Sequence, residues 1–209
     1  SLLLVFRTNS AYERWWEGRK LWGSLINSCR NLAIKFNVML PKNDIENRTF
    51  SREMLGLFPV ELHIHLQKEH LAADYVKPLP SIENFTRSKH VPAQYANALM
   101  SRVQEWYRDK IISGEQLITL NAELQSLMDI AGACERIKNT PIPYSYSSFL
   151  KKFIVIYTLT LPFGFAFSLG WVTIPIVLFI FYVLATLELI AEEIEEPFGI
   201  DPNDLPIAT

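Results

Sequence analysis

A run without a single charged side chain, residues 153–187, constrains this sequence more than any other feature. As one straight helix its 35 residues would measure about 50 Å, which exceeds the ~30 Å hydrocarbon core of a bilayer. Each half contains a proline, and Gly170-Trp171 lies at the middle. The pattern therefore predicts a membrane hairpin, with residues 153–169 as one helical leg and residues 172–188 as the other.

The competing interpretation is a helical hairpin buried inside a soluble domain. Soluble cores of this length usually retain some charge, so the membrane interpretation is favoured. Two cysteines in 209 residues exclude a disulfide-stapled secreted scaffold.

Charge is divided sharply along the chain. All 20 Lys and Arg lie at or before Lys152, and that part carries a net charge of +5. The remainder has seven acids and no base, which gives −7. Because basic flanks stay cytoplasmic, we expect Lys152 and the acidic C-terminal end on the cytoplasmic side, with Trp171 at the opposite membrane surface. A pI near 6.1 argues against a nucleic-acid partner.

Apolar residues recur at helical spacing before the hairpin, and no alternating strand pattern occurs. The predicted helices cover residues 2–39, 51–71, 92–112 and 115–137. The predicted connections are a polar loop over 41–49, an extended loop over 75–92 and a linker over 139–148. Pro59 is expected to kink or break the second helix. The predicted fold class is all-α, with helices packed on helices.

The sequence gives no support for an enzyme. It contains no glycine-rich phosphate loop and no hydrolase or zinc-protease motif. His63, His65 and His70 invite a metal hypothesis, but residues two apart do not share a helix face and no acid or thiol completes the set. We therefore expect surface histidines. Cys29 and Cys134 lie on apolar stripes and are predicted to be buried structural thiols.

Acidic residues gather after the hairpin, at Glu192, Glu193, Glu195, Glu196, Asp201 and Asp204. Carboxylates near Pro197 and Gly199 suit calcium chemically, although the spacing is not that of an EF-hand. The alternatives are a solvated acidic cap, or one that pairs with a basic surface of the helices.

The N-terminal stretch is typical of the lower end of a membrane helix, and we expect further sequence before Ser1. Trp15 and Trp16 suit the headgroup depth, where Arg14 and Lys20 would meet phosphate. These features predict an anchor in lipid.

Three stretches resemble the bacterial branch of the bestrophin family of ion channels. They are FRTNSAYERWWEGRKLWG at residues 6–23, CERIKNTPIP at 134–143 and EPFGIDPND at 196–204. They stand in family order and bracket nearly the whole chain. The resemblance implies a homopentamer around one central pore, in which the second of four membrane helices lines a hydrophobic neck.

On that resemblance, the neck positions in this sequence are Phe6 and, one turn earlier, Leu2. Five copies would form stacked apolar rings that can gate by dewetting. The alternative is that both side chains pack against a neighbouring helix. The family also has a lower cytoplasmic constriction, for which Ile112 and Ile118 are the candidates.

Calcium is where the sequence departs from the family pattern. Animal members are calcium-activated anion channels with a longer acidic run, whereas bacterial members resemble cation channels. Asp201 and Asp204 match liganding positions of the family's calcium clasp. Only these two carboxylates remain, with Pro202 between them, so the resemblance implies a remnant of the clasp at Asp201 and Asp204 and does not imply calcium control.

The resulting prediction is a homopentameric, passive, cation-selective channel of the bacterial inner membrane, with lipid and monovalent ions as its partners. The expected parts are a pore-lining helix end (residues 1–18), a cytoplasmic helical domain (19–148), a transmembrane hairpin (149–190) and an acidic cytoplasmic segment (191–209). The alternatives are a non-conducting membrane-anchored scaffold or sensor, and a metal-dependent enzyme using His63 and His65.

Overall fold

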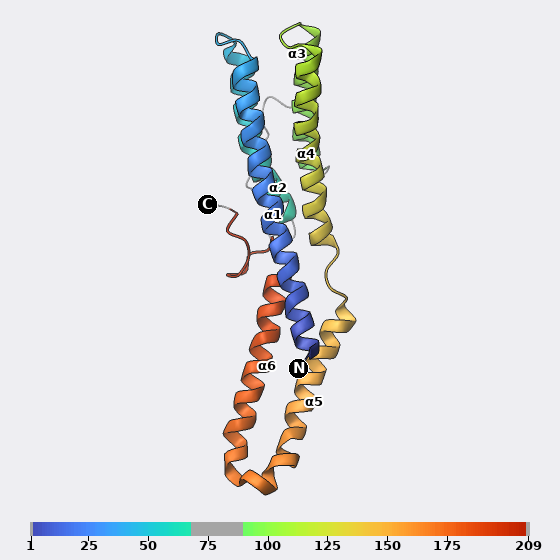
Figure 1. Cartoon of the computed structure of the whole chain (residues 1–209), viewed down its shortest axis with the longest axis vertical. Coiled ribbons are helices and arrows are strands. Elements are labelled where there is room, and N and C mark those ends of the chain that lie inside the picture. The colour runs from blue at the N-terminus through green and yellow to red at the C-terminus, as the bar shows by residue number, and fades with distance from the viewer. Residues whose placement is uncertain (1, 68–89, 208–209) are drawn as a thin grey trace.

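The computed structural model describes residues 2–67 and 90–207, and these residues form helices and connections without a strand. The elements are α1 (Leu2–Met39), α2 (Ile45–Leu66), α3 (Val91–Arg108), α4 (Gly114–Asn139), α5 (Tyr144–Leu169), the 3₁₀ turn η1 (Gly170–Val172) and α6 (Thr173–Glu195). The all-α prediction is confirmed for this part of the chain. Figure 1 shows an elongated molecule, with α5 and α6 at one end and the bundle of α1 to α4 at the other.

Helix α1 connects the two ends of the molecule. Its bounds agree with the predicted helix over 2–39, because proline is absent until Pro41. Its C-terminal part places Leu25, Leu32 and Phe36 in the bundle core, and its N-terminal part lies beside the hairpin (Figure 1). One helix therefore connects the apolar hairpin to the bundle.

Helix α2 begins earlier than predicted, so the second half of the predicted polar loop is wrong. The Asp44 side chain caps the helix by accepting a hydrogen bond from the Asn47 backbone N–H (3.2 Å), which satisfies one of the unpaired amides of a helix start. Pro59 lies inside the helix without ending it. The helix buries an apolar side that includes Phe58 and Leu62.

Helix α3 starts at Val91 and ends four residues before the predicted Ile112. Lys110 adopts a positive φ of 59°, a left-handed conformation that does not continue a helix. Ser113 then caps α4 in a capping box with Gln116, which stabilises the new helix start. Most of the predicted extended loop, like His70, lies outside the described residues.

The apolar run folds back on itself as predicted. Gly170 has a φ of +53° that glycine adopts without a Cβ penalty, and the reversal at Gly170-Trp171 is confirmed. Helix α5 begins at Tyr144, so the second half of the predicted linker is helical. Pro175 lies in the first turn of α6, where its missing N–H costs no helical hydrogen bond.

Residues Tyr144–Glu195 form the one continuous helical stretch, among the described residues, that is long and apolar enough to cross a membrane. Only 11% of its most apolar window is buried. A hairpin inside a soluble core would be mostly covered, so the alternative of a buried soluble hairpin disagrees with this exposure. Apolar side chains such as Phe167, which is 98% exposed, would be covered by lipid if the hairpin lies in a membrane.

Candidate functional site

The first two turns of α1 present two different faces. Leu4 and Ala11 are buried, and Leu4 closes a cavity of about 370 Å³ between α5 and α6. Leu2 and Phe6 point away from that contact and are 69% and 56% exposed. Within the described chain, neither side chain packs closely against a neighbouring helix, so that alternative disagrees with the structure of the single subunit. Their role in a pore neck stays a prediction.

The exposed face of α1 changes from apolar to polar along the helix. Asn9 and Glu13 follow Leu2 and Phe6 at helical spacing, so all four share one side. Asn9 and Glu13 are exposed, and the Asn9 amide donates to Glu13 Oε1 (3.0 Å). A carboxylate therefore lies on the same face as the two predicted neck residues, about two turns below Phe6.

Arg7 is a buried charged residue, paired between α1 and α6, that the sequence reasoning missed. Its side chain is 1% exposed, and its Nη2 lies 2.6 Å from Glu195 Oε2 and its Nε 3.7 Å from Glu188 Oε1. The Glu188 side chain is also buried, at 4% exposed. A buried guanidinium between two carboxylates needs these partners, because unpaired charge is costly to bury. The only available signal was one arginine within an apolar start, facing a chain end rich in acids.

Arg14 does not serve the predicted phosphate contact. It donates to the backbone oxygens of Ile137 (2.6 Å), Thr140 (2.6 Å) and Glu195 (3.1 Å). Because helix ends leave carbonyls without partners, Arg14 joins the C-terminal ends of α4 and α6 to α1.

Trp15 likewise contacts protein and not the expected headgroups. Its Nε1 donates to the Asn203 backbone oxygen (3.0 Å), so it holds the segment after α6. That segment inserts Phe198 into the core. A Cβ at Gly18 would lie 3.2 Å from Phe198, so this glycine permits the close approach. Trp16 remains 45% exposed.

The acidic cluster pairs largely within the chain. Glu192 bonds Lys151 (2.7 Å), Glu195 bonds Arg7 and Glu193 accepts from Asn203 (2.5 Å). Of the two alternatives to a calcium site, pairing with basic residues of the helices therefore describes Glu192 and Glu195, whereas Glu193 bonds a neutral amide.

Asp201 and Asp204 bond one another. Asp204 Oδ2 accepts from the Asp201 backbone N–H (2.5 Å), and burial raises the pKa of Asp204 to about 6. Within the described ranges, neither residue belongs to a group of three potential metal ligands. Their role as calcium ligands stays a prediction from the resemblance.

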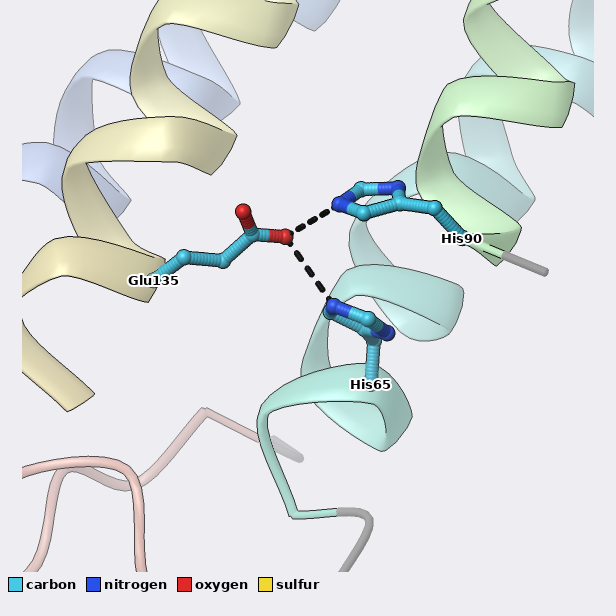
Figure 2. A group of neighbouring side chains, drawn as sticks. All are labelled: His65, His90 and Glu135. Atoms are coloured by element: carbon cyan, nitrogen blue, oxygen red, sulfur yellow. Dashed lines mark hydrogen bonds and ion pairs between the residues drawn. The ribbon is translucent and has the colours of Figure 1, made fainter. Parts of the chain in front are cut away.

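His63 and His65 are not the exposed surface residues that the spacing predicted. His63 packs edge-on against Trp22, with ring centroids 6.3 Å apart, and burial lowers its pKa. His65 and His90 both approach Glu135 (Figure 2). The spacing argument failed because it considered one helix, whereas these three side chains come from different elements.

The remaining predicted residues separate into buried and exposed. Cys134 is fully buried and Cys29 is half-buried, and burial raises their pKa values to about 12 and about 11. The prediction of structural thiols holds for Cys134 and in part for Cys29.

Ile112 belongs to the core and cannot line an aperture, whereas Ile118 is 72% exposed and stays a candidate for the lower constriction.

Known proteins resemble this chain over its whole length. The family model described as Bacterial/Fungal Bestrophin protein matches residues 1–209. A voltage-dependent anion channel-forming protein of Nostoc sp. is 39% identical over 99% of this chain and 69% of its own length. A protein of the same description from Escherichia coli is 33% identical over 99% and 68%.

Solved structures agree with these relatives. The crystal structure of a bacterial bestrophin homologue from Klebsiella pneumoniae superposes with a TM-score of 0.88 at 27% identity, over 99% of this chain and 77% of that one. The arrangement of the helices is therefore similar to that of a membrane protein determined by experiment.

Proposed function

Because this chain belongs to the bacterial and fungal bestrophin family, we propose that it is one subunit of a homopentameric channel that conducts ions passively across the bacterial inner membrane. Residues 1–18 and 149–190 would lie in the membrane in contact with lipid, and residues 19–148 and 191–209 in the cytoplasm. The family and the channel-forming names of the relatives point to a channel and not to an enzyme.

One observation carries the proposal: Leu2 and Phe6 are exposed beside the apolar hairpin while the opposite side of α1 is packed. Within the described part of a single subunit, these two side chains have no apolar partner that would cover them. Around a five-fold axis, they would form two stacked apolar rings at membrane depth. Rings of this kind restrict a pore and gate it by dewetting.

Exposed apolar side chains outside the hairpin support assembly with further copies. Ile34, Val38 and Ile45 are 63%, 77% and 75% exposed, although they lie in the part expected in water. A groove of about 720 Å³, which Ile45 helps to line, runs between α1 and α2. Surfaces of this kind on a soluble part mark protein contacts.

Cation selectivity is the finer part of the proposal, and Glu13 supports it. Glu13 is exposed on the same face of α1 as Leu2 and Phe6, so five copies would place a ring of carboxylates below the neck. Such rings favour cations in channels. The relatives' names describe anion channels, which makes chloride conduction the second candidate.

Planar-bilayer recording with the purified protein under a KCl gradient tests the proposal. We expect a single-channel current whose reversal potential lies toward that of potassium. Replacing Phe6 by Ala should widen the neck and raise conductance several-fold, whereas Ile118→Ala tests the lower constriction separately. A reversal potential at that of chloride would support the anion candidate.

The scaffold alternative makes a different prediction. It requires a monomer or dimer in detergent and no current under any gradient. Native mass spectrometry of the detergent-solubilised protein distinguishes these masses from that of a pentamer.

A further inference from the structure

Three potential metal ligands converge where α2, α3 and α4 meet (Figure 2). His65 lies in the last turn of α2, His90 directly precedes α3, and Glu135 lies near the C-terminal end of α4. Glu135 Oε1 is 3.0 Å from His65 Nε2 and 2.5 Å from His90 Nε2. The three ligand atoms all lie within 4.8 Å of one another. Residues far apart in sequence therefore direct their donor atoms at one point.

We propose that His65, His90 and Glu135 bind a divalent transition-metal ion, with Zn²⁺ as the representative cation. Two imidazole nitrogens and one carboxylate oxygen form a donor set that zinc uses, with a fourth position for water. Calcium and magnesium prefer oxygen ligands alone, so they are disfavoured here. A bound Zn²⁺ with two neutral imidazoles and one carboxylate would leave a net charge of +1.

The observed distances are close to those that zinc requires. Bonds of about 2.0–2.1 Å in a tetrahedral site put neighbouring ligand atoms about 3.3 Å apart. The two nitrogen–oxygen distances, 3.0 and 2.5 Å, need to lengthen by less than ~1 Å. The side chains of His65, His90 and Glu135 are 19%, 37% and 24% exposed. The cluster is thus held by its surroundings but open enough for an ion and a water to enter.

Metal binding would be coupled to the start of α3 through the His90 ring. His90 Nδ1 accepts a hydrogen bond from the Ala93 backbone N–H (3.1 Å), so in the neutral ring the proton lies on Nε2, facing Glu135. Coordination through Nε2 requires that proton to leave, and in a neutral ring it then resides on Nδ1. Nδ1 can no longer accept from Ala93, so the bound ion replaces the side-chain cap of α3.

The position of the cluster gives the ion a structural consequence. It would cross-link α2 and the start of α3 to α4. The next residue of α4, Arg136, bonds Glu17 of α1 through Nη2 and Oε1 (2.7 Å). An ion that binds the folded chain better than the unfolded chain stabilises it by mass action. We therefore expect Zn²⁺ to raise the thermal midpoint of the bundle.

The test uses tag-free, full-length protein in detergent, stripped with a chelator and titrated with Zn²⁺ by calorimetry. We expect one Zn²⁺ per chain and a raised thermal midpoint, with no comparable response to Ca²⁺. His65→Ala and Glu135→Gln should each weaken Zn²⁺ binding by more than about 10-fold. Loss of a residue that only orients a metal ligand already costs about 10–100-fold in affinity, and loss of a ligand itself should cost at least as much. His63→Ala is the matched control on the same helix and should leave the affinity unchanged.

Two further measurements keep the proposal decidable if a variant folds poorly. Co²⁺ bound to the wild-type protein should give the absorption bands of a tetrahedral nitrogen–oxygen site, and Zn²⁺ should speed hydrogen exchange in the first turn of α3. His65→Gln, checked for helical content by circular dichroism, replaces the ligand while retaining a polar side chain. Absence of Zn²⁺ binding by the wild type, or equal binding by His63→Ala, His65→Gln and Glu135→Gln, would overturn the proposal.

Discussion

Arg7 is the residue whose removal should most damage the packing of α1 against α6. It is buried between Glu188 and Glu195, so Arg7→Met leaves buried carboxylates without a cation. Breaking such a pair from one side costs about 3–5 kcal/mol. We expect a loss of that size in the free energy of unfolding, measured by chemical denaturation in detergent.

The exposed Arg30 on the same helix supplies the control for this prediction. Arg30→Met should change stability by less than about 0.5 kcal/mol. Adding Glu188→Gln to Arg7→Met should restore part of the loss, since it removes one of the two carboxylates that lose their partner. Equal effects of Arg7→Met and Arg30→Met would contradict the role of the buried cluster.

The two thiols give a prediction about pH. Burial raises the pKa of Cys134 to about 12 and that of Cys29 to about 11, from the ordinary 9.0. A raised pKa means that the folded state holds its protons longer than the unfolded state. The two protonated thiols therefore contribute fully to the free energy of unfolding below pH 9, and this contribution decreases as the pH rises from 9 toward 11–12.

Thiol labelling measures this effect residue by residue. At pH 8, Cys134 in a Cys29→Ser background should react far more slowly in the folded protein than after denaturation, because the thiolate is the reactive form. Cys29, which is half-buried, should react faster than Cys134 in the folded protein. Labelling of Cys134 at the same rate before and after denaturation would show that the thiol is not buried.

Single residues also show where sequence reasoning reached its limit. Apolar periodicity predicted the helix over residues 2–39 that places Leu25, Leu32 and Phe36 in the core, because apolar spacing is a local signal. It could not place Arg7 or the His65–Glu135 contact. Those positions depend on which elements meet in space, and one chain without its fold does not contain that information.

At the scale of elements, the turn of the hairpin can be tested with two glycines. Gly170 has a φ of +53° with open space around it, so Gly170→Ala should destabilise the hairpin by about 1 kcal/mol through backbone strain alone. Gly164 lies inside α5 and also has open space. Gly164→Ala should therefore be neutral or stabilising by up to about 1 kcal/mol. Thermal unfolding should show a loss of stability for Gly170→Ala and none for Gly164→Ala, and equal losses would contradict the assigned turn.

The ends of elements were less predictable than their existence. The uncharged run and its central glycine were enough to predict the hairpin, because both features act locally. The start of α2 at Ile45 depends on the Asp44 cap, and the end of α3 depends on the positive φ of Lys110. Neither residue breaks the apolar periodicity, so periodicity alone placed both boundaries several residues away.

At the scale of the whole molecule, the neck residues were accessible only through resemblance to a family. Periodicity favours packing Leu2 and Phe6 against a neighbouring helix, since apolar side chains usually indicate a contact. Within the described chain they remain exposed. A face that is buried only in an assembly carries no separate signal in the sequence of one subunit.

Selectivity is the property of the assembly that Glu13 should control. If five copies of α1 surround the axis with Leu2 and Phe6 inward, Glu13 lies on the same inward face and forms a carboxylate ring. Glu13→Gln should lower the potassium-to-chloride permeability ratio several-fold, and Glu13→Arg should lower it further, because a ring of positive charge attracts anions. Reversal potentials under a KCl gradient measure the ratio directly. Glu53→Gln, an exposed carboxylate on α2, should leave it unchanged. If both Gln variants retain the wild-type reversal potential, Glu13 lies outside the conduction path and α1 does not present this face to the pore.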